Sequence, residues 1–175
     1  MVKDKVVVYG LSTEGYFLAC QMATNGADVH IIDESSSSAI SLKAETAKTY
    51  PSVVSLRGDE PLLSMKPIGI AVSEANYLFF TPRIRKTGQD LKTEINSKFK
   101  EAVKSLKKDS SIVYCIPTGF TGNNENILLL KHVTGFDAGK SISYFYFPLD
   151  NMDDTPQIIG SMSKIDDKKL LSLLT

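Results

Sequence analysis

The stretch from Val6 to Asp33 constrains the fold of this chain more than any other. The apolar run from Val6 to Tyr9 leads into Gly10, a helix-like segment follows, and a second apolar run ends at Asp33. An apolar strand, a glycine turn, a helix and a second strand ending in an acid form a βαβ unit of the dinucleotide-binding type. The sequence therefore predicts an α/β protein of the Rossmann-like class.

The turn of this unit departs from the usual G-x-G-x-x-G pattern at one position. Gly10 permits the tight turn off the strand, and Gly15 lets the helix pack close to the sheet. The middle glycine is replaced by Ser12, whose hydroxymethyl group is costly if the position needs a positive φ angle. The N–H groups at the start of the helix, from Thr13 onward, are those that would hold a pyrophosphate.

Two acidic residues have opposite consequences for a nucleotide. Asp33 stands 23 positions after Gly10, where it would accept hydrogen bonds from the adenosine ribose, so NAD is favoured over NADP. Glu14 suits the dipole of the helix but competes with a phosphate for the same field. NAD is the expected cofactor, and loss of nucleotide binding is the open alternative.

Composition excludes several classes of partner. The chain has 175 residues, of which 20 are basic and 20 acidic, so no global field attracts nucleic acid or an anionic membrane. No apolar run approaches the roughly 20 residues of a membrane span. The segment from Met1 to Lys5 leads straight into a strand and leaves no room for a signal peptide, which predicts a cytoplasmic location.

The cysteines and histidines do not form a metal-binding pattern. Cys20 and Cys115 belong to no C-x-x-C pair, and no ligand cluster with His30 or His132 is visible. We expect the two cysteines to be buried as small hydrophobes. We expect His30 to pack in a strand and His132 to lie on a helix surface.

Strand-like and helix-like segments alternate along the chain, which predicts a doubly wound, mostly parallel sheet in a single domain over residues 1–175. The predicted strands are residues 5–9, 28–32, 53–56, 77–80, 112–116 and 143–147. The predicted helices are residues 13–25, 38–48, 88–107 and 123–133, with a helical turn at 60–65 and a short tail helix from 166. For residues 67–75 a helix and a strand at 68–72 remain alternatives.

Further along, a series of punctuating residues follows an ordered pattern. Thr81-Pro82 ends one predicted strand, and the next closes in Ile116-Pro117-Thr118-Gly119. An aromatic strand then ends in Phe147-Pro148 and precedes the segment 155–160, Thr-Pro-Gln-Ile-Ile-Gly. The series, over about residues 5–172, resembles the N-terminal domain of the UDP-glucose/GDP-mannose dehydrogenase family. Those enzymes oxidise a nucleotide sugar from alcohol to acid with NAD.

The resemblance implies a dinucleotide cleft at the carboxyl edge of the sheet. Its expected cofactor-binding residues are Gly10, Ser12, Thr13, Gly15, Asp33, Thr81, Pro82 and Thr118. Three basic residues follow the strand end at Pro82, and they either bind an anion or decorate a loop: Arg83, Arg85 and Lys86.

The catalytic positions of the family are not kept. Cys115 stands where the family has a threonine that assists the chemistry, and Leu149 stands where it has a glutamate that helps deacylate a thioester. Leucine cannot accept a proton. The second domain, which supplies a lysine, an asparagine, the nucleophilic cysteine and an aspartate, is missing from the sequence. We therefore expect no catalytic residue in this chain.

Three functions follow as alternatives. The first is a stand-alone NAD-binding domain with a regulatory or pseudoenzyme role. The second is half of an NAD-dependent UDP-sugar oxidoreductase that another chain completes, and the third is an interaction module that has lost its nucleotide. The family's central helix, absent here, would cover an apolar surface. We therefore expect a homodimer or hetero-complex through that surface and the tail Leu170–Leu174.

Overall fold

The computed structural model describes residues 2–32, 67–84, 86–149, 160–163 and 167–175. Its strands are β1 (Lys5–Tyr9), β2 (Asp28–Ile32), β3 (Tyr77–Phe80), β4 (Ser111–Tyr114), β5 (Ser143–Tyr146) and β6 (Gly160–Met162). Its helices are α1 (Thr13–Thr24), α4 (Ile68–Glu74), α5 (Gln89–Val103), α6 (Gly122–Thr134) and α7 (Asp167–Leu174). The predicted elements at 38–48, 53–56 and 60–65 lie outside these residues.

The strands form one sheet in the order β2-β1-β3-β4-β5-β6. Strands β1 to β5 pair in parallel, and β6 pairs antiparallel with β5. The predicted doubly wound, mostly parallel α/β fold is therefore confirmed. Strand β6 has no signal in the sequence, because its three residues are all exposed and lack the apolar run of a buried strand.

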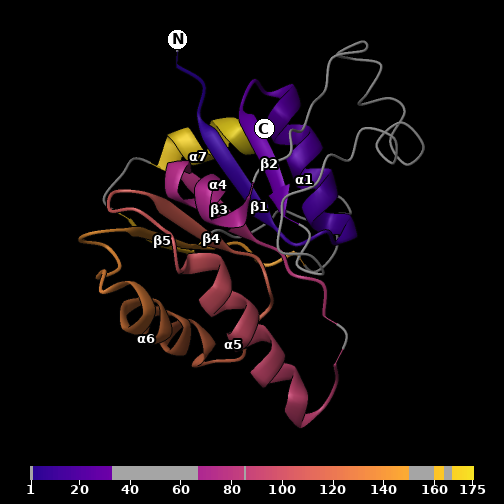
Figure 1. The fold of residues 1–175 in the computed structure, drawn as a ribbon, viewed down its shortest axis with the longest axis vertical. Coiled ribbons are helices and arrows are strands. Elements are labelled where there is room, and N and C mark those ends of the chain that lie inside the picture. The colour runs from indigo at the N-terminus through magenta and orange to yellow at the C-terminus, as the bar shows by residue number, and fades with distance from the viewer. Residues whose placement is uncertain (1, 33–66, 85, 150–159, 164–166) are drawn as a thin grey trace.

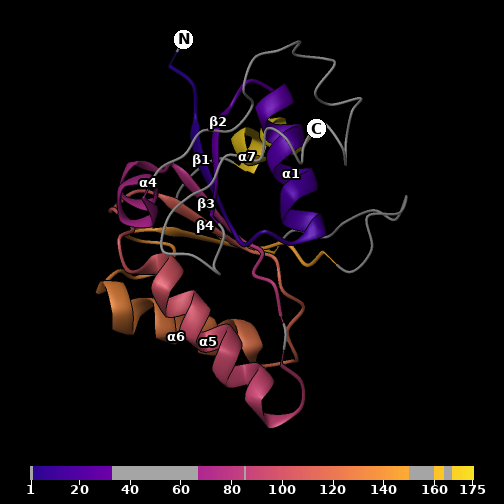
Figure 2. The same ribbon diagram turned by 45° about the vertical axis from the view of Figure 1, so that its right-hand side comes forward.

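Helices cover both faces of the sheet. Figure 1 shows α1 and α7 on one side and α5 and α6 on the other, and the turned view in Figure 2 shows the same separation. A hydrophobic core lies on each face of the sheet, and successive side chains of β1 point into opposite cores. Val6 and Val8 pack with α1, whereas Val7 and Tyr9 pack with α4 and α5. Burial on both faces explains why the parallel strands read as unbroken apolar runs.

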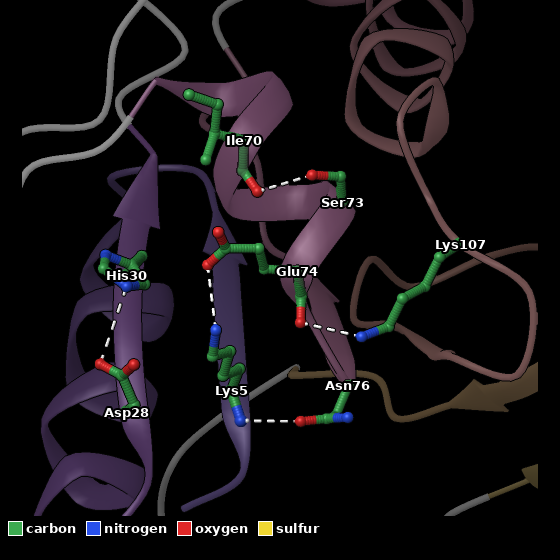
Figure 3. Close-up of polar contacts among 8 residues, drawn as sticks. All are labelled: Lys5, Asp28, His30, Ile70, Ser73, Glu74, Asn76 and Lys107. Carbon is green, nitrogen blue, oxygen red and sulfur yellow. Dashed lines mark hydrogen bonds and ion pairs between the residues drawn. The ribbon is translucent and has the colours of Figure 1, made fainter.

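The segment after Pro67 is a helix, which decides between the two alternatives left open by the sequence. Polar contacts at the amino ends of the strands hold α4 in place (Figure 3). Lys5 Nζ lies 3.1 Å from a carboxylate oxygen of Glu74, and Lys107 Nζ donates to the Glu74 carbonyl oxygen at 3.0 Å. Asn76, which follows α4, accepts a hydrogen bond from the Lys5 backbone N–H.

The tail helix α7 packs on α1 of the same chain. Leu170 and Leu173 are buried in the core beneath α1, whereas 44% of Leu171 is exposed. The side chains of Gln21 and Asn25 donate hydrogen bonds to the carbonyl oxygens of Leu174 and Leu173, respectively. The leucines expected to meet a partner are thus largely occupied within the chain, which leaves Leu171 as the most exposed of them.

Candidate functional site

The turn after β1 requires glycine at two positions. Gly10 has a φ angle of +117°, and a Cβ atom there would lie 2.1 Å from the carbonyl oxygen of Thr81. A Cβ at Gly15 would lie 2.3 Å from Oγ1 of Thr81 and 2.8 Å from the Gly10 carbonyl oxygen. The turn and the first part of α1 therefore pack directly against the end of β3, which confirms the close packing expected of these glycines.

Ser12 fits the turn without backbone strain. Its φ angle is −88° and its ψ angle 165°, which is extended backbone that any residue adopts, so the middle position does not need glycine for conformational reasons. Its Oγ accepts a hydrogen bond from the Gly15 N–H at 3.0 Å and donates one to the Thr81 carbonyl oxygen at 3.0 Å. Ser12 is therefore the N-cap of α1.

An open depression of about 650 Å³ lies beside the start of α1. Its wall comes from the segments that follow β1, β3, β4 and β5, so it lies at the carboxyl edge of the parallel strands, where this fold class binds ligands. It is lined by Ser12, Thr13, Glu14, Pro82, Arg83, Ile84, Ile116 and Leu149.

Most of the expected cofactor-binding residues meet around this depression. Ser12, Thr13 and Pro82 line it, and Gly10, Gly15 and Thr81 form the packed turn beneath them. Thr81 itself is only 2% exposed, and its hydroxyl donates to the Tyr9 carbonyl oxygen at 3.3 Å, so its side chain supports the turn.

Two of the expected residues are not part of this arrangement. Asp33 lies outside the described residues. Thr118 lines a different cavity, between α5 and α6, and its backbone N–H donates to the Tyr146 hydroxyl at 3.0 Å.

The loop that follows Pro82 is fastened to α5. Lys98 donates from Nζ to the Arg83 carbonyl oxygen, and Glu94 accepts a hydrogen bond of 2.8 Å from the Lys86 N–H. Glu94 and Lys98 also form an ion pair of 3.1 Å. The side chains of this pair are 11% and 17% exposed, so it is only weakly screened by solvent. This pair positions the backbone of one wall of the depression.

The two positions at which the chain departs from the dehydrogenase pattern lack catalytic character. Cys115 is buried, and burial raises the pKa of its thiol, so it is not a reactive thiolate at neutral pH. Leu149 lines the depression with an apolar side chain, and its backbone N–H donates to the Cys115 carbonyl oxygen at 3.1 Å. Cys20 and His30 are buried and His132 is exposed, as expected.

The residues present fit the phosphate end of a dinucleotide. The first N–H groups of an α-helix have no partner inside the helix, and those of Thr13 and Glu14 lie where the depression meets α1. Two features weaken this cradle. The N–H of Gly15 already donates its hydrogen bond to Ser12, and the carboxylate of Glu14 repels an anion.

Solved structures with the same fold include sugar-nucleotide dehydrogenases. An NDP-N-acetyl-D-galactosaminuronic acid dehydrogenase from Methanosarcina mazei Go1 matches 98% of this chain and 42% of its own, with a TM-score of 0.71 and 14% identity. A GDP-mannose dehydrogenase from Pseudomonas aeruginosa matches 97% of this chain and 43% of its own, with a TM-score of 0.73 and 18% identity.

A third similar structure belongs to another class of oxidoreductase. An imine reductase from Myxococcus stipitatus, in complex with NAD⁺, matches 99% of this chain and 52% of its own, with a TM-score of 0.57 and 12% identity. No family model and no curated protein matches the sequence. The predicted resemblance is thus confirmed at the level of fold, and the chain spans less than half the length of the two sugar-nucleotide dehydrogenases.

Within the described ranges, no helix has both the length and the apolar character that crossing a bilayer requires.

Proposed function

We propose that this chain is a dinucleotide-binding domain that holds NAD at the depression beside α1 and performs no dehydrogenase chemistry on its own. The observation that carries the proposal is the packing of Gly10 and Gly15 against Thr81. That packing positions the N–H groups of Thr13 and Glu14 at the edge of the depression, where a pyrophosphate would accept their hydrogen bonds.

The same site argues against autonomous catalysis. Hydride transfer from a sugar alcohol needs a group that takes up the hydroxyl proton, and the wall near Cys115 has only the apolar side chains of Ile116 and Leu149 in the depression. The carboxylate that lines the depression, that of Glu14, belongs to the start of α1, where the phosphates would bind. The thiol of Cys115 is buried and stays protonated, so it offers no base or nucleophile. We therefore propose a regulatory or pseudoenzyme role for the chain, in the cytoplasm.

The test is a thermal-shift titration followed by an activity assay. NAD that binds only the folded state raises its stability, and millimolar NAD against a Kd of about 10 μM should add about 2.7 kcal/mol. We expect such a shift, and no NADH from UDP-glucose or GDP-mannose. An unchanged unfolding temperature at millimolar NAD would contradict the proposal and would favour the interaction module instead. NADH production by this chain alone would show it to be a working enzyme.

We also propose that the chain associates with a second copy or with another protein. Phe17 on α1 is 39% exposed and Leu171 on α7 is 44% exposed, and these two helices pack against each other. Apolar side chains on one layer of the molecule favour association when they form a patch. Sedimentation at tens of micromolar is expected to show a dimer, and a pull-down tests for another partner. A monomer with no captured partner would remove this proposal.

A further inference from the structure

A second cavity lies between α5, α6 and the loop that joins β4 to α6. Its volume is about 370 Å³, within the size range of small-molecule sites. None of its lining residues is shared with the depression beside α1. Its walls include Leu91 and Ile95 of α5 and the buried residues Tyr114 and Asn126. The dinucleotide proposed above does not account for it.

The polar floor of this cavity is built and oriented by hydrogen bonds. The Tyr144 hydroxyl donates to Oδ1 of Asn123 at 2.8 Å and accepts from Nδ2 of Asn126 at 3.4 Å. With the Tyr144 proton donated to Asn123, the end of the Asn126 amide that faces Tyr144 is its Nδ2 donor. Among the described residues, Oδ1 of Asn126 accepts no hydrogen bond, although only 6% of the residue is exposed.

Tyr114 supplies the complementary donor. It lines the cavity, is 2% exposed and lies close enough to Asn126 for the two side chains to interact, and its proton can be donated to a group in the cavity. Burial raises the pKa of Tyr114 to about 12, so the hydroxyl is protonated at neutral pH. The floor therefore offers a ligand an O–H donor from Tyr114 and a C=O acceptor from Asn126.

The charge and the shape of the walls restrict the ligand further. The lining contains two charged side chains, Lys92 and Glu125, and they neutralise each other in an ion pair of 2.6 Å between α5 and α6. The cavity thus favours a neutral molecule. Leu91 and Ile95 offer an apolar surface on which a ring can pack. The Tyr114 hydroxyl and Oδ1 of Asn126 can form hydrogen bonds with the edge of that ring.

We propose that this cavity binds the lactam edge of a nucleobase or a similar neutral ring. The ring carbonyl accepts the proton of Tyr114, and the adjacent ring N–H donates to Oδ1 of Asn126. A single lactam edge satisfies both groups at once. A ring without that N–H leaves the Asn126 oxygen unmatched and is rejected.

The test uses inosine as the probe and 1-methylinosine as its matched control, because the methyl group blocks the ring N–H. Amide shifts in ¹⁵N–¹H spectra of the full chain are followed during each titration. Saturable shifts at Thr118, Gly122 and Asn126 are expected with inosine, with binding at least about tenfold weaker for 1-methylinosine, the equivalent of one neutral hydrogen bond.

Variants separate this site from the proposed NAD site. Tyr114→Phe keeps the ring and removes the donor, so inosine affinity should fall about tenfold while the thermal shift with NAD stays unchanged. Asn124→Leu, at an exposed position of α6, should change neither ligand's affinity. Failure of NAD to bind would leave the inosine result standing, so the two proposals are tested independently.

Three results would overturn the inference. The first is the absence of saturable shifts with inosine up to about 10 mM, the weakest affinity such a site would be expected to have. The second is equal binding of inosine and 1-methylinosine. The third is binding of methyl α-glucoside in preference to inosine, which would assign the cavity to a sugar.

Discussion

The Ser12 hydroxyl donates a hydrogen bond to the Thr81 carbonyl oxygen and thereby joins the turn after β1 to the end of β3. The same hydroxyl accepts the N–H of Gly15, so a single side chain caps α1 and links two neighbouring strands. Serine therefore has a structural role at a position where the dinucleotide pattern has glycine. In the proposed NAD site, its bond from the Gly15 N–H removes one of the donors that would hold the phosphate.

Removing the Ser12 hydroxyl should lower the stability of the fold and raise its affinity for NAD. Ser12→Gly and Ser12→Ala both release the Gly15 N–H, so NAD affinity should rise by a factor of about three to ten. Loss of the cap should cost about 1 kcal/mol of unfolding free energy in the alanine variant. Ser12→Thr keeps the hydroxyl and is the control. Calorimetric titration with NAD measures the affinity, and weaker binding by both variants would contradict this role for Ser12.

The glycines of the turn should tolerate no side chain. A Cβ at Gly10 would lie 2.1 Å from a backbone oxygen, and φ is positive there, so Gly10→Ala should cost more than about 2 kcal/mol of unfolding free energy. Gly26→Ala is the matched control. Gly26 also has a positive φ, of +95°, but nothing lies within 4 Å of an added Cβ, so the cost should be only about 1 kcal/mol. Urea unfolding measures both, and equal losses would refute the close packing.

Alkaline pH should destabilise the fold through its buried tyrosines. Burial raises the pKa values of Tyr77 and Tyr114 from 10 to about 12 in the folded state. Between pH 10 and 12 the unfolded chain therefore loses protons that the folded chain keeps. The stability that these groups contribute is complete below pH 10 and disappears as the pH rises toward 12.

Phenolate absorbance and urea unfolding at several pH values check this expectation. Tyr114→Phe should lessen the decline of the unfolding free energy above pH 10, because it removes one group whose pKa differs between the two states. A decline of the same steepness in the variant would show that Tyr114 titrates normally in the folded chain.

The tail helix should contribute to the stability of the fold through its buried leucines and not through its exposed one. Leu170 is fully buried, so Leu170→Ala should cost about 2–5 kcal/mol of unfolding free energy. Leu171→Ala should cost less than about 1 kcal/mol, because 44% of that residue is exposed. If α7 left α1 to bind a partner, the two variants would instead have similar unfolding free energies as isolated chains.

The sequence predicted the elements whose signal is local. The strand from Lys5 to Tyr9, the helix after Ser12 and the long helix after Gly88 all have the expected periodicity, and the structure contains them. The short α4 was ambiguous, because seven residues of mixed apolar character suit a helix or a strand. Strand β6 was missed because only its pairing with β5 defines it.

The site was predictable in part for the same reason. The glycine spacing located the turn, but the bond from Ser12 to Thr81 joins residues 69 positions apart and leaves no local pattern. The cavity between α5 and α6 was missed as well. Asn126 stands four positions before the buried Leu130, on the stripe of α6 that faces the core, and a polar residue on such a stripe was the available signal.

The most direct test of the proposed NAD site is a titration of the ¹⁵N-labelled chain with NAD, followed through backbone amide shifts. We expect saturable shifts at Thr13, Glu14 and Gly15, because their N–H groups lie at the start of α1 beside the depression. Unchanged amides at these residues in millimolar NAD, or shifts confined to α5 and α6, would contradict it.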